Sequence, residues 1–433
     1  MKTFKIKLPL LFAILALSLT VSASQLTDRL SAIKNVAMIS VMTDSAGFAE
    51  KYEILYSHPL DYKKPKVGQF NERIILCHVG FDRPTIVVTE GYWATYAENI
   101  KYRDEISKLL NANVVVCEYR YFGKSIPQPC NWDYLTVENS LNDIHEVVTS
   151  LKNIYKGKWL ATGISKGGQT TMFYRAFFPN DVDVSVPYVA PLNKSVEDGR
   201  HEPFIEKITG TEEDRKAVLD FQLKFCKRKS AILPYFEKLC KDKKYAFNVP
   251  ISEIYDYWIL EYSFAFWQWG NKLSDIPADT LNDKSMADFM MKYNDPSYFQ
   301  KNSEFISFNV QAAKELGYYG YDTKPFGKYM KTLNTKDYLR RLMLPDTLRN
   351  IPFDNSLYKR TVKFLKKNDP KMLYIYGEYD PWSASGVCQW LDTSKKHNLK
   401  IYVQPGGSHR SRINNMPDNM REEIINQLKE WMR

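Results

Sequence analysis

The segment at residues 158–179, KWLATGISKGGQTTMFYRAFFP, most constrains the fold that this chain can adopt. It contains the pattern G-x-S-x-G at 163–167, after a short apolar run and before a helix-like stretch that ends at Pro179. A strand, a tight turn and a helix form the context of a nucleophile elbow, in which the central serine is exposed on a strained turn. We therefore predict that Ser165 is a nucleophile. We also expect the backbone N–H of Lys166 to face a developing oxyanion, with the lysine side chain exposed.

Strand-like and helix-like segments alternate on both sides of this turn, which predicts a parallel sheet with right-handed crossovers. The expected strands lie at 51–62, 70–79, 85–89, 113–118, 159–162, 182–189, 371–376 and 400–404. Between the sixth and seventh of them, the sequence is mainly helical. We predict an α/β fold of the α/β-hydrolase class with a mainly helical cap inserted at that point. The expected divisions are a signal peptide at 1–23, core at 24–192, cap at 193–367 and core at 368–433.

The first residues have the composition of an export signal. Lysines at 2, 5 and 7 precede an apolar run from Leu8 to Leu19, and Val21-Ser22-Ala23 provides a small-residue cleavage site. The apolar run is short for a membrane span. We expect an exported protein, periplasmic or secreted, with no stable membrane insertion after the signal is removed.

Charge and cysteine spacing exclude other classes of partner. The formal net charge is +10, but Lys and Arg are scattered among acidic residues rather than gathered, so we predict no nucleic-acid partner. The six cysteines are even in number and could form disulfides after export, although their pairing does not follow from sequence. They lack the paired C-x-x-C spacing of a zinc site. We expect neither a metal nor a cofactor.

A nucleophilic serine needs a histidine base and an acid that orients it, and in this fold class the chain order is Ser, acid, His. His409 follows the last expected strand in a glycine-bearing loop, whereas His397 precedes that strand and falls at its wrong end. Asp380 follows the preceding strand, with Glu378 and Asp392 as rival acids. Open parallel sheets place their sites at the carboxyl ends of strands, which favours Asp380 and His409.

The turn after the strand at 85–89 is expected to supply a second oxyanion donor, the backbone N–H of Gly91 or Tyr92. Glu90 and Glu118 each end a buried strand and should lie near the site. Each could bind the free α-amino group of a substrate. Alternatively, each caps its strand or pairs with a nearby arginine.

Several motifs together resemble the secreted tripeptidyl aminopeptidase family, the S37 or PS-10 serine peptidases. They are T-G-x-S-K-G-G at 162–168, E-Y-R-Y-F-G at 118–123 and G-E-Y-D-P-W-S at 377–383, with further similarity from 56 onwards. The chain is also similar, more distantly, to the S28 family of prolyl carboxypeptidases and dipeptidyl peptidases. Tyr119 departs from the pattern, because histidine is common there.

The resemblance implies a serine peptidase that releases short peptides from free N-termini, often next to proline, without a cofactor. It implies Ser165, Asp380 and His409 as the catalytic triad and a helical cap that restricts entry. Trp382, from the third motif, is a further candidate for substrate binding. The aromatic stretch at 255–269 is more typical of a core than of a specificity pocket, although it could form an apolar wall.

Two other functions remain open at this stage. A carboxylesterase or lipase would use the same triad on esters. A catalytically silent exported protein could instead bind peptides, although three intact catalytic residues disfavour that reading. The length of the released peptide and the oligomeric state do not follow from the sequence.

Overall fold

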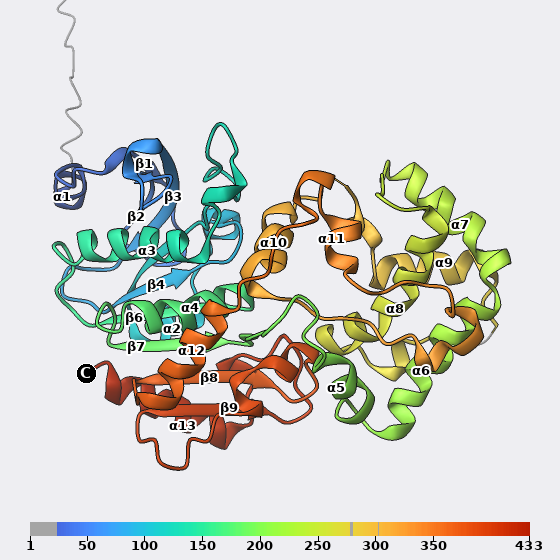
Figure 1. Ribbon diagram of the computed structural model, residues 1–433. Helices are drawn as coiled ribbons and strands as arrows, with labels where there is room; N and C mark the ends of the chain where they lie inside the picture. Colours follow the sequence, from blue (N-terminus) through green and yellow to red (C-terminus); the bar gives the residue numbers. More distant parts are fainter. Residues whose placement is uncertain (1–23, 278–279, 302) are drawn as a thin grey trace, which may run out of the picture.

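A computed structural model describes residues 24–277, 280–301 and 303–433, so the predicted signal peptide at 1–23 lies outside the described residues. In the described chain, nine strands form one sheet in the order β1-β2-β3-β5-β4-β6-β7-β8-β9 (Figure 1). The strands are β1 (Val36–Met42), β2 (Glu50–Pro59), β3 (Gln69–His78), β4 (Thr85–Thr89), β5 (Asn113–Cys117), β6 (Trp159–Ile164), β7 (Val184–Tyr188), β8 (Met372–Gly377) and β9 (Leu399–Gln404).

The sheet is antiparallel at one end and parallel from β5 to β9. Each of the eight strands expected from the sequence is present, close to its expected limits. Strand β1, which forms one edge of the sheet, was not predicted from the sequence. Several of its residues face solvent, and Val41 is 80% exposed. The apolar residues of β1 are therefore less buried than those of the strands that the sequence pattern predicted.

Helices cover both faces of the sheet, which makes three layers. The described helices are α1 (Gln25–Ser31), α2 (Glu105–Leu110), α3 (Val137–Leu151), α4 (Lys166–Phe177), α5 (His201–Lys207), α6 (Glu212–Lys227), α7 (Lys229–Asp242), α8 (Ile251–Trp269), α9 (Asp283–Tyr293), α10 (Ile306–Gln311), α11 (Tyr338–Met343), α12 (Ser356–Lys367) and α13 (Asp418–Trp431). One face packs against α1, α3, α4 and α12, and the other against α2 and α13. The α/β-hydrolase class is thereby confirmed.

The helices α5 to α11 form a separate layer to the right of the sheet in Figure 1. They connect β7 to β8, which are the sixth and seventh of the strands expected from sequence. Helix α12 lies within the range predicted for the cap, yet its Leu357 and Leu365 pack in the core beside the sheet. The exact division between core and cap stays a prediction.

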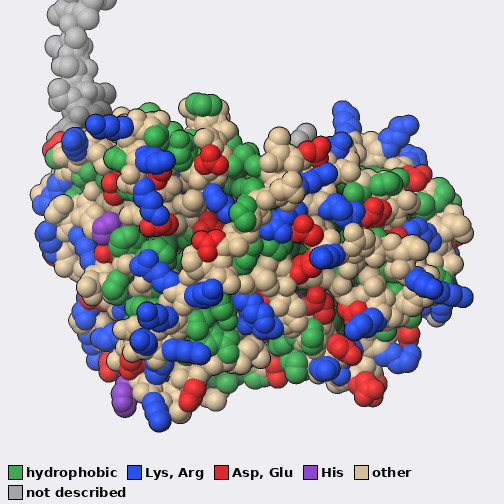
Figure 2. All heavy atoms as spheres, in the orientation of Figure 1, with side chains coloured by type: hydrophobic (Ala, Val, Ile, Leu, Met, Phe, Trp, Pro, Cys, Tyr) green, Lys and Arg blue, Asp and Glu red, His purple; other side chains and the backbone are tan. Residues whose placement is uncertain are grey.

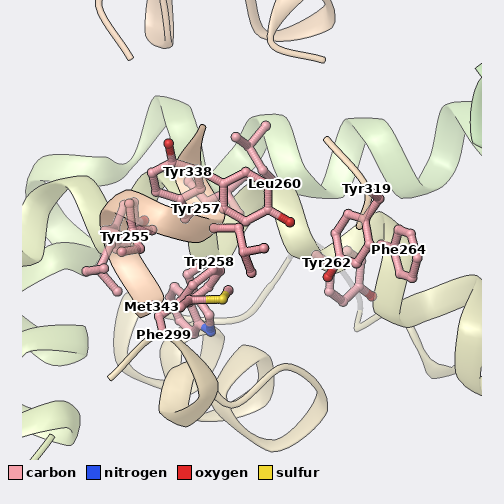
Figure 3. Packing of buried hydrophobic residues seen from close by; sticks show 14 of the residues in the cluster. Tyr255, Tyr257, Trp258, Leu260, Tyr262, Phe264, Phe299, Tyr319, Tyr338 and Met343 are labelled. Atoms are coloured by element: carbon pink, nitrogen blue, oxygen red, sulfur yellow. The ribbon is translucent and has the colours of Figure 1, made fainter. Parts of the chain in front are cut away.

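Helix α8 forms the centre of the cap and contains the aromatic stretch noted in the sequence. Pro250 precedes it, and Gly270 ends it with a left-handed φ of 67°, a conformation that glycine adopts without strain. Its side chains Tyr257, Trp258 and Phe264 are buried among residues of the surrounding helices (Figure 3). The expectation that most of this stretch is core is confirmed.

Charged side chains of both signs are scattered over the visible surface, as they are along the sequence. In Figure 2, Lys and Arg side chains are interspersed with Asp and Glu over the visible face. Within the described residues, no helix is both long and apolar enough to cross a membrane. The six cysteines are free thiols, and Cys130 is the exposed one among them.

Candidate active site

The turn between β6 and α4 has the geometry of a nucleophile elbow. Ser165 lies there with φ 59° and ψ −119°, a conformation that is strained for any residue other than glycine. A Cβ on Gly163 would lie 2.4 Å from the backbone carbon of Gly167, and one on Gly168 would lie 2.4 Å from the carbonyl oxygen of Tyr188. The glycines are therefore required for the close contact between strand and helix that holds the serine in this conformation.

The predicted acid and base lie in direct contact. Asp380 follows β8, His409 follows β9, and the imidazole Nδ1 lies 2.7 Å from the Asp380 Oδ2. Both side chains are buried. The other Asp380 oxygen accepts the backbone N–H of Trp382 at 3.1 Å, which fixes the carboxylate. The buried His409 Nε2 has no hydrogen-bond partner among the described residues, so it is available for another group.

The rival acids Glu378 and Asp392 and the rival base His397 make their contacts outside the Asp380–His409 pair. Glu378 accepts the backbone N–H of Gly406 at 2.7 Å and so shapes the histidine loop from outside the site. Asp392 accepts the backbone N–H of Ser394 at 2.9 Å. The backbone N–H of His397 donates to Asp369, before β9 begins.

Two cavities meet at Ser165. The larger, of about 840 Å³, is lined by both Ser165 and His409 and by Glu90 of the turn after β4. The smaller, of about 290 Å³, extends from Ser165 into the cap and is lined by Trp382. Aromatic residues occur in both linings, and those shared by the two cavities are Tyr92, Trp269 and Phe305. A chain bound across Ser165 can therefore extend in two directions.

The turn after β4 packs directly on the elbow. A Cβ on Gly91 would lie 2.5 Å from the Cγ of Lys166 and 2.9 Å from the backbone nitrogen of Gly167. The Gly91 N–H donates to the Glu90 Oε2 at 3.3 Å. The N–H of Lys166 belongs to the first turn of α4, where backbone donors have no intrahelical partner.

The Lys166 side chain contradicts the expectation from sequence. It was expected to be exposed, but it is 2% exposed. Its Nζ donates to the Gly91 carbonyl at 2.6 Å and lies 3.3 Å from the centroid of the Tyr119 ring. Burial holds the pKa of Lys166 well below its ordinary value. The side chain thus fastens the elbow to the turn at Gly91, and Tyr119, the departure from the family pattern, covers its amino group.

The two candidate carboxylates occupy different places. Glu90 lines the larger cavity, bonds to the Tyr96 hydroxyl and has a pKa raised by burial. Glu118 is fully buried and lines neither cavity. Its oxygens bond to the Arg73 guanidinium and to the backbone N–H groups of Ala94 and Lys124. These contacts fit the alternative hypothesis, a carboxylate that pairs with a nearby arginine, here Arg73.

Sequence reasoning missed a third carboxylate, Glu261 of α8. It lines the smaller cavity and is 5% exposed. The Tyr321 hydroxyl donates to its Oε2 at 2.6 Å, and the Tyr319 hydroxyl lies 2.9 Å from the same oxygen. Burial raises the pKa of Glu261 to about 7, although these hydroxyls oppose the shift. The available signal was an acidic residue in the middle of the aromatic run I-L-E-Y-S-F at 259–264.

No group of three or more His, Cys, Asp and Glu in the described part of the chain is placed to hold a metal ion.

Comparison with known proteins extends the similarity over the whole chain. A family model described as PS-10 peptidase S37 matches residues 20–432. A prolyl tri/tetrapeptidyl aminopeptidase of Streptomyces mobaraensis is 27% identical over 434 residues, which cover 96% of this chain and 87% of the relative. A lysosomal Pro-X carboxypeptidase of Mus musculus is 23% identical over 192 residues, 40% of this chain and 38% of the relative.

Among solved structures, a proline iminopeptidase of Mycobacterium smegmatis matches with a TM-score of 0.40 and 14% identity, covering 91% of this chain and 99% of that one. An esterase of Pyrococcus furiosus has the same TM-score and identity, with 88% and 91% covered. The match of the family model is far more extensive than a single motif. The chain therefore belongs to the PS-10 peptidase S37 family, as the motifs around Ser165 and Asp380 predicted.

Proposed function

We propose that the protein is an exported serine peptidase that releases short peptides, chiefly tripeptides, from free N-termini, with a preference for proline next to the cleaved bond. Membership of the S37 family supports the peptidase activity. The similarity to a prolyl tri/tetrapeptidyl aminopeptidase supports the direction of cleavage and the preference for proline. The signal-like composition of residues 1–23 supports export to the periplasm or the medium.

In this proposal, Ser165 attacks the carbonyl carbon of the substrate while His409 Nε2 accepts the hydroxyl proton. Asp380, 2.7 Å from Nδ1, holds the imidazole in the tautomer that leaves Nε2 free, and stabilises the imidazolium. The backbone N–H of Lys166 and one from Gly91 or Tyr92 donate to the oxyanion; for Gly91, the N–H turns to the oxyanion from the Glu90 Oε2. The imidazolium then protonates the leaving amine. Water, activated by the same imidazole, releases the acyl group from the serine.

The observation that carries the proposal is the pairing of Asp380 with a buried His409, which lines a cavity together with Ser165 and whose Nε2 has no hydrogen-bond partner among the described residues. We infer that the cap restricts binding to chain ends, because Glu261 and Ala265 of α8 line the smaller cavity that extends from Ser165. Its walls include Trp382 and Tyr318, which offer flat apolar surfaces to a proline ring.

The test uses the purified protein without residues 1–23 and a panel of peptides, each with a free or an acetylated N-terminus. Products are identified by mass spectrometry. We expect release of N-terminal tripeptides from free termini only, and loss of all cleavage in Ser165→Ala. Equal cleavage of acetylated peptides would contradict the aminopeptidase. Turnover of p-nitrophenyl esters with no peptide cleavage would favour the esterase.

A further inference from the structure

We propose that Glu261 binds the α-ammonium group of the substrate at the inner end of the smaller cavity. This assignment rests on the aminopeptidase activity proposed above and names the residue that reads the free N-terminus. A free N-terminus differs from an acetylated one by a positive charge, so an anionic group about one tripeptide's length from the nucleophile would distinguish the two.

Glu261 is a buried carboxylate for which no cation partner is found among the described residues. Hydroxyls of Tyr319 and Tyr321 bond to it, and it forms no ion pair with any residue that the structure describes. Burying a carboxylate without a counter-charge is costly, so proteins normally retain such a group only for a function. A ligand cation that lies next to the carboxylate would remove this cost.

The cavity around Glu261 contains another polar group without a partner. The Asn309 Nδ2 is buried, lines the same cavity and makes no hydrogen bond among the described residues. Asn309 is 3% exposed. A peptide carries carbonyl oxygens that could accept from this group. The remaining lining is largely aromatic, which suits a short peptide whose charge lies at one end.

The position of Glu261 along α8 also indicates how far its carboxylate lies from the reacting centre. The carbonyl of Gln268, seven residues later, accepts the backbone N–H of His409 at 2.9 Å. Seven helical residues advance roughly 10 Å along the axis. Three extended residues span about 10 Å as well. A peptide whose ammonium group is held at Glu261 would therefore place its third peptide bond near the histidine loop and Ser165, which lines the same cavity.

The other acidic residues near the site are less suited to this role. Glu118 is saturated by internal donors and lines neither cavity. Asp295 lines the smaller cavity but is already paired with Lys243 at 2.8 Å. Glu90, in the turn after β4, and Asp104 and Glu105, at the start of α2, line the larger cavity instead. With the acyl part of the substrate in the smaller cavity, the larger one receives the leaving peptide.

The experiment compares Glu261→Gln, which removes the charge but keeps the size of the side chain, with Glu253→Gln on the same helix. Glu253 pairs with Arg341 and lines neither cavity at Ser165. Substrates are a proline-containing tripeptide p-nitroanilide with a free or acetylated terminus, and p-nitrophenyl acetate. For Glu261→Gln we expect kcat/KM on the free peptide to fall by at least 100-fold, and ester turnover to fall far less. Glu253→Gln should cleave the free peptide as the parent does.

Ester turnover reports that each variant is folded, and Tyr321→Phe provides a second, milder variant. It removes one hydrogen bond from the carboxylate but leaves the charge, so KM for the free peptide should change by less than tenfold. Undiminished cleavage of the free peptide by Glu261→Gln would overturn the assignment, as would loss of discrimination in Glu90→Gln alone. Failure of the parent enzyme to distinguish free from acetylated peptides would instead overturn the proposed aminopeptidase.

Discussion

The backbone N–H of His409 donates to the carbonyl oxygen of Gln268 at 2.9 Å, so the last turn of cap helix α8 holds the loop of the predicted base. The next residues reinforce this contact. The Trp269 ring lies edge-on to the imidazole, with centroids 6.1 Å apart. A Cβ on Gly270 would lie 2.8 Å from the Ser408 Oγ. The last turn of α8 therefore both lines the smaller cavity and contacts the loop that carries the imidazole.

Gly270→Ala should separate these two elements and lower kcat. Its φ of 67° is unfavourable for alanine, and the added methyl group would contact Ser408. We expect kcat on both peptide and ester to fall by about tenfold or more, because the imidazole loses its alignment. The control is Gly199→Ala, which has a φ of 73° but nothing within 4 Å of the added Cβ. That variant should lose stability alone, and an equal loss of kcat in both would contradict the coupling.

Lys166→Met should weaken oxyanion stabilisation without touching the substrate. Removing the amino group leaves the Gly91 carbonyl without its donor at 2.6 Å, and a buried unsatisfied carbonyl costs about 1–3 kcal/mol. We expect kcat to fall for peptide and ester alike, with little change in KM. Lys158→Met is the matched control, because its Nζ also donates to a backbone carbonyl, that of Trp431, far from the site. Unchanged kcat in Lys166→Met would show that the turn at Gly91 keeps its position without the hydrogen bond from the lysine amino group.

Asp380→Asn should reduce kcat by about 10⁴-fold with a smaller effect on KM, because an amide favours the wrong imidazole tautomer. The Asp380 carboxylate is the group that contacts His409 Nδ1 at 2.7 Å. Glu378→Gln, a change at the rival acid, should leave most of the activity, since Glu378 bonds only to the backbone at Gly406 in this loop. The reverse ranking of the two variants would identify Glu378 as the acid.

The pH dependence of peptide cleavage should reveal Glu261. The groups facing its carboxylate are the Tyr298, Tyr319 and Tyr321 hydroxyls, and beyond Tyr319 lies the buried His201 ring. Burial raises the pKa of Glu261 to about 7, so below that pH the carboxyl is neutral and binds an ammonium poorly. The α-amino group of the substrate loses its proton near a pKa of about 8.

The ratio of kcat/KM on a free peptide to kcat/KM on an ester should therefore rise with pH through about 7 and fall above about 8. Titration of the catalytic imidazole affects both substrates and cancels in this ratio. In Glu261→Gln the rising limb should disappear. Persistence of that limb in the variant would assign it to another group.

Stability should fall as the pH rises, through a buried cluster remote from the site. His58 of β2 lies 3.0 Å from Glu72 and 3.1 Å from Glu146. Burial lowers the pKa of His58, but Asp143, Glu146 and Glu72 overcome this and raise it to about 9. For the Glu72 carboxyl, burial acts in the opposite direction and raises the pKa to about 7. In both cases the folded state binds more protons than the unfolded state.

The contribution of protonated His58 is thus fully present below its unfolded pKa of 6.5 and is lost as the pH rises through about 9. Thermal unfolding measured from pH 6 to 10 should show this decline, and His58→Gln should flatten it. His145→Gln serves as the control, because His145 pairs with Asp181 at the surface of α3. An identical pH dependence in the parent and His58→Gln would contradict the role of His58.

Much of the core was predictable because its signals are local. The buried parallel strands are short, continuous apolar runs, and the G-x-S-x-G turn needs glycines at fixed positions to avoid backbone contacts. The placement of Asp380 and His409 follows from strand order, since the carboxyl ends of parallel strands meet at one edge. Edge strand β1 escaped prediction because its apolar residues are only partly buried.

The sequence by itself determined the fold class, the family and the chain order of the predicted triad. Only the tertiary structure decided which carboxylates line the cavities at Ser165. Glu118 and Glu261 each lie beside apolar residues in the chain, yet the first is saturated by Arg73 and the second lines a cavity. It also decided that Lys166 is buried, because the turn that covers it comes from another strand. Charge, burial and hydrogen-bond partners depend on contacts between distant segments, and local pattern does not encode them.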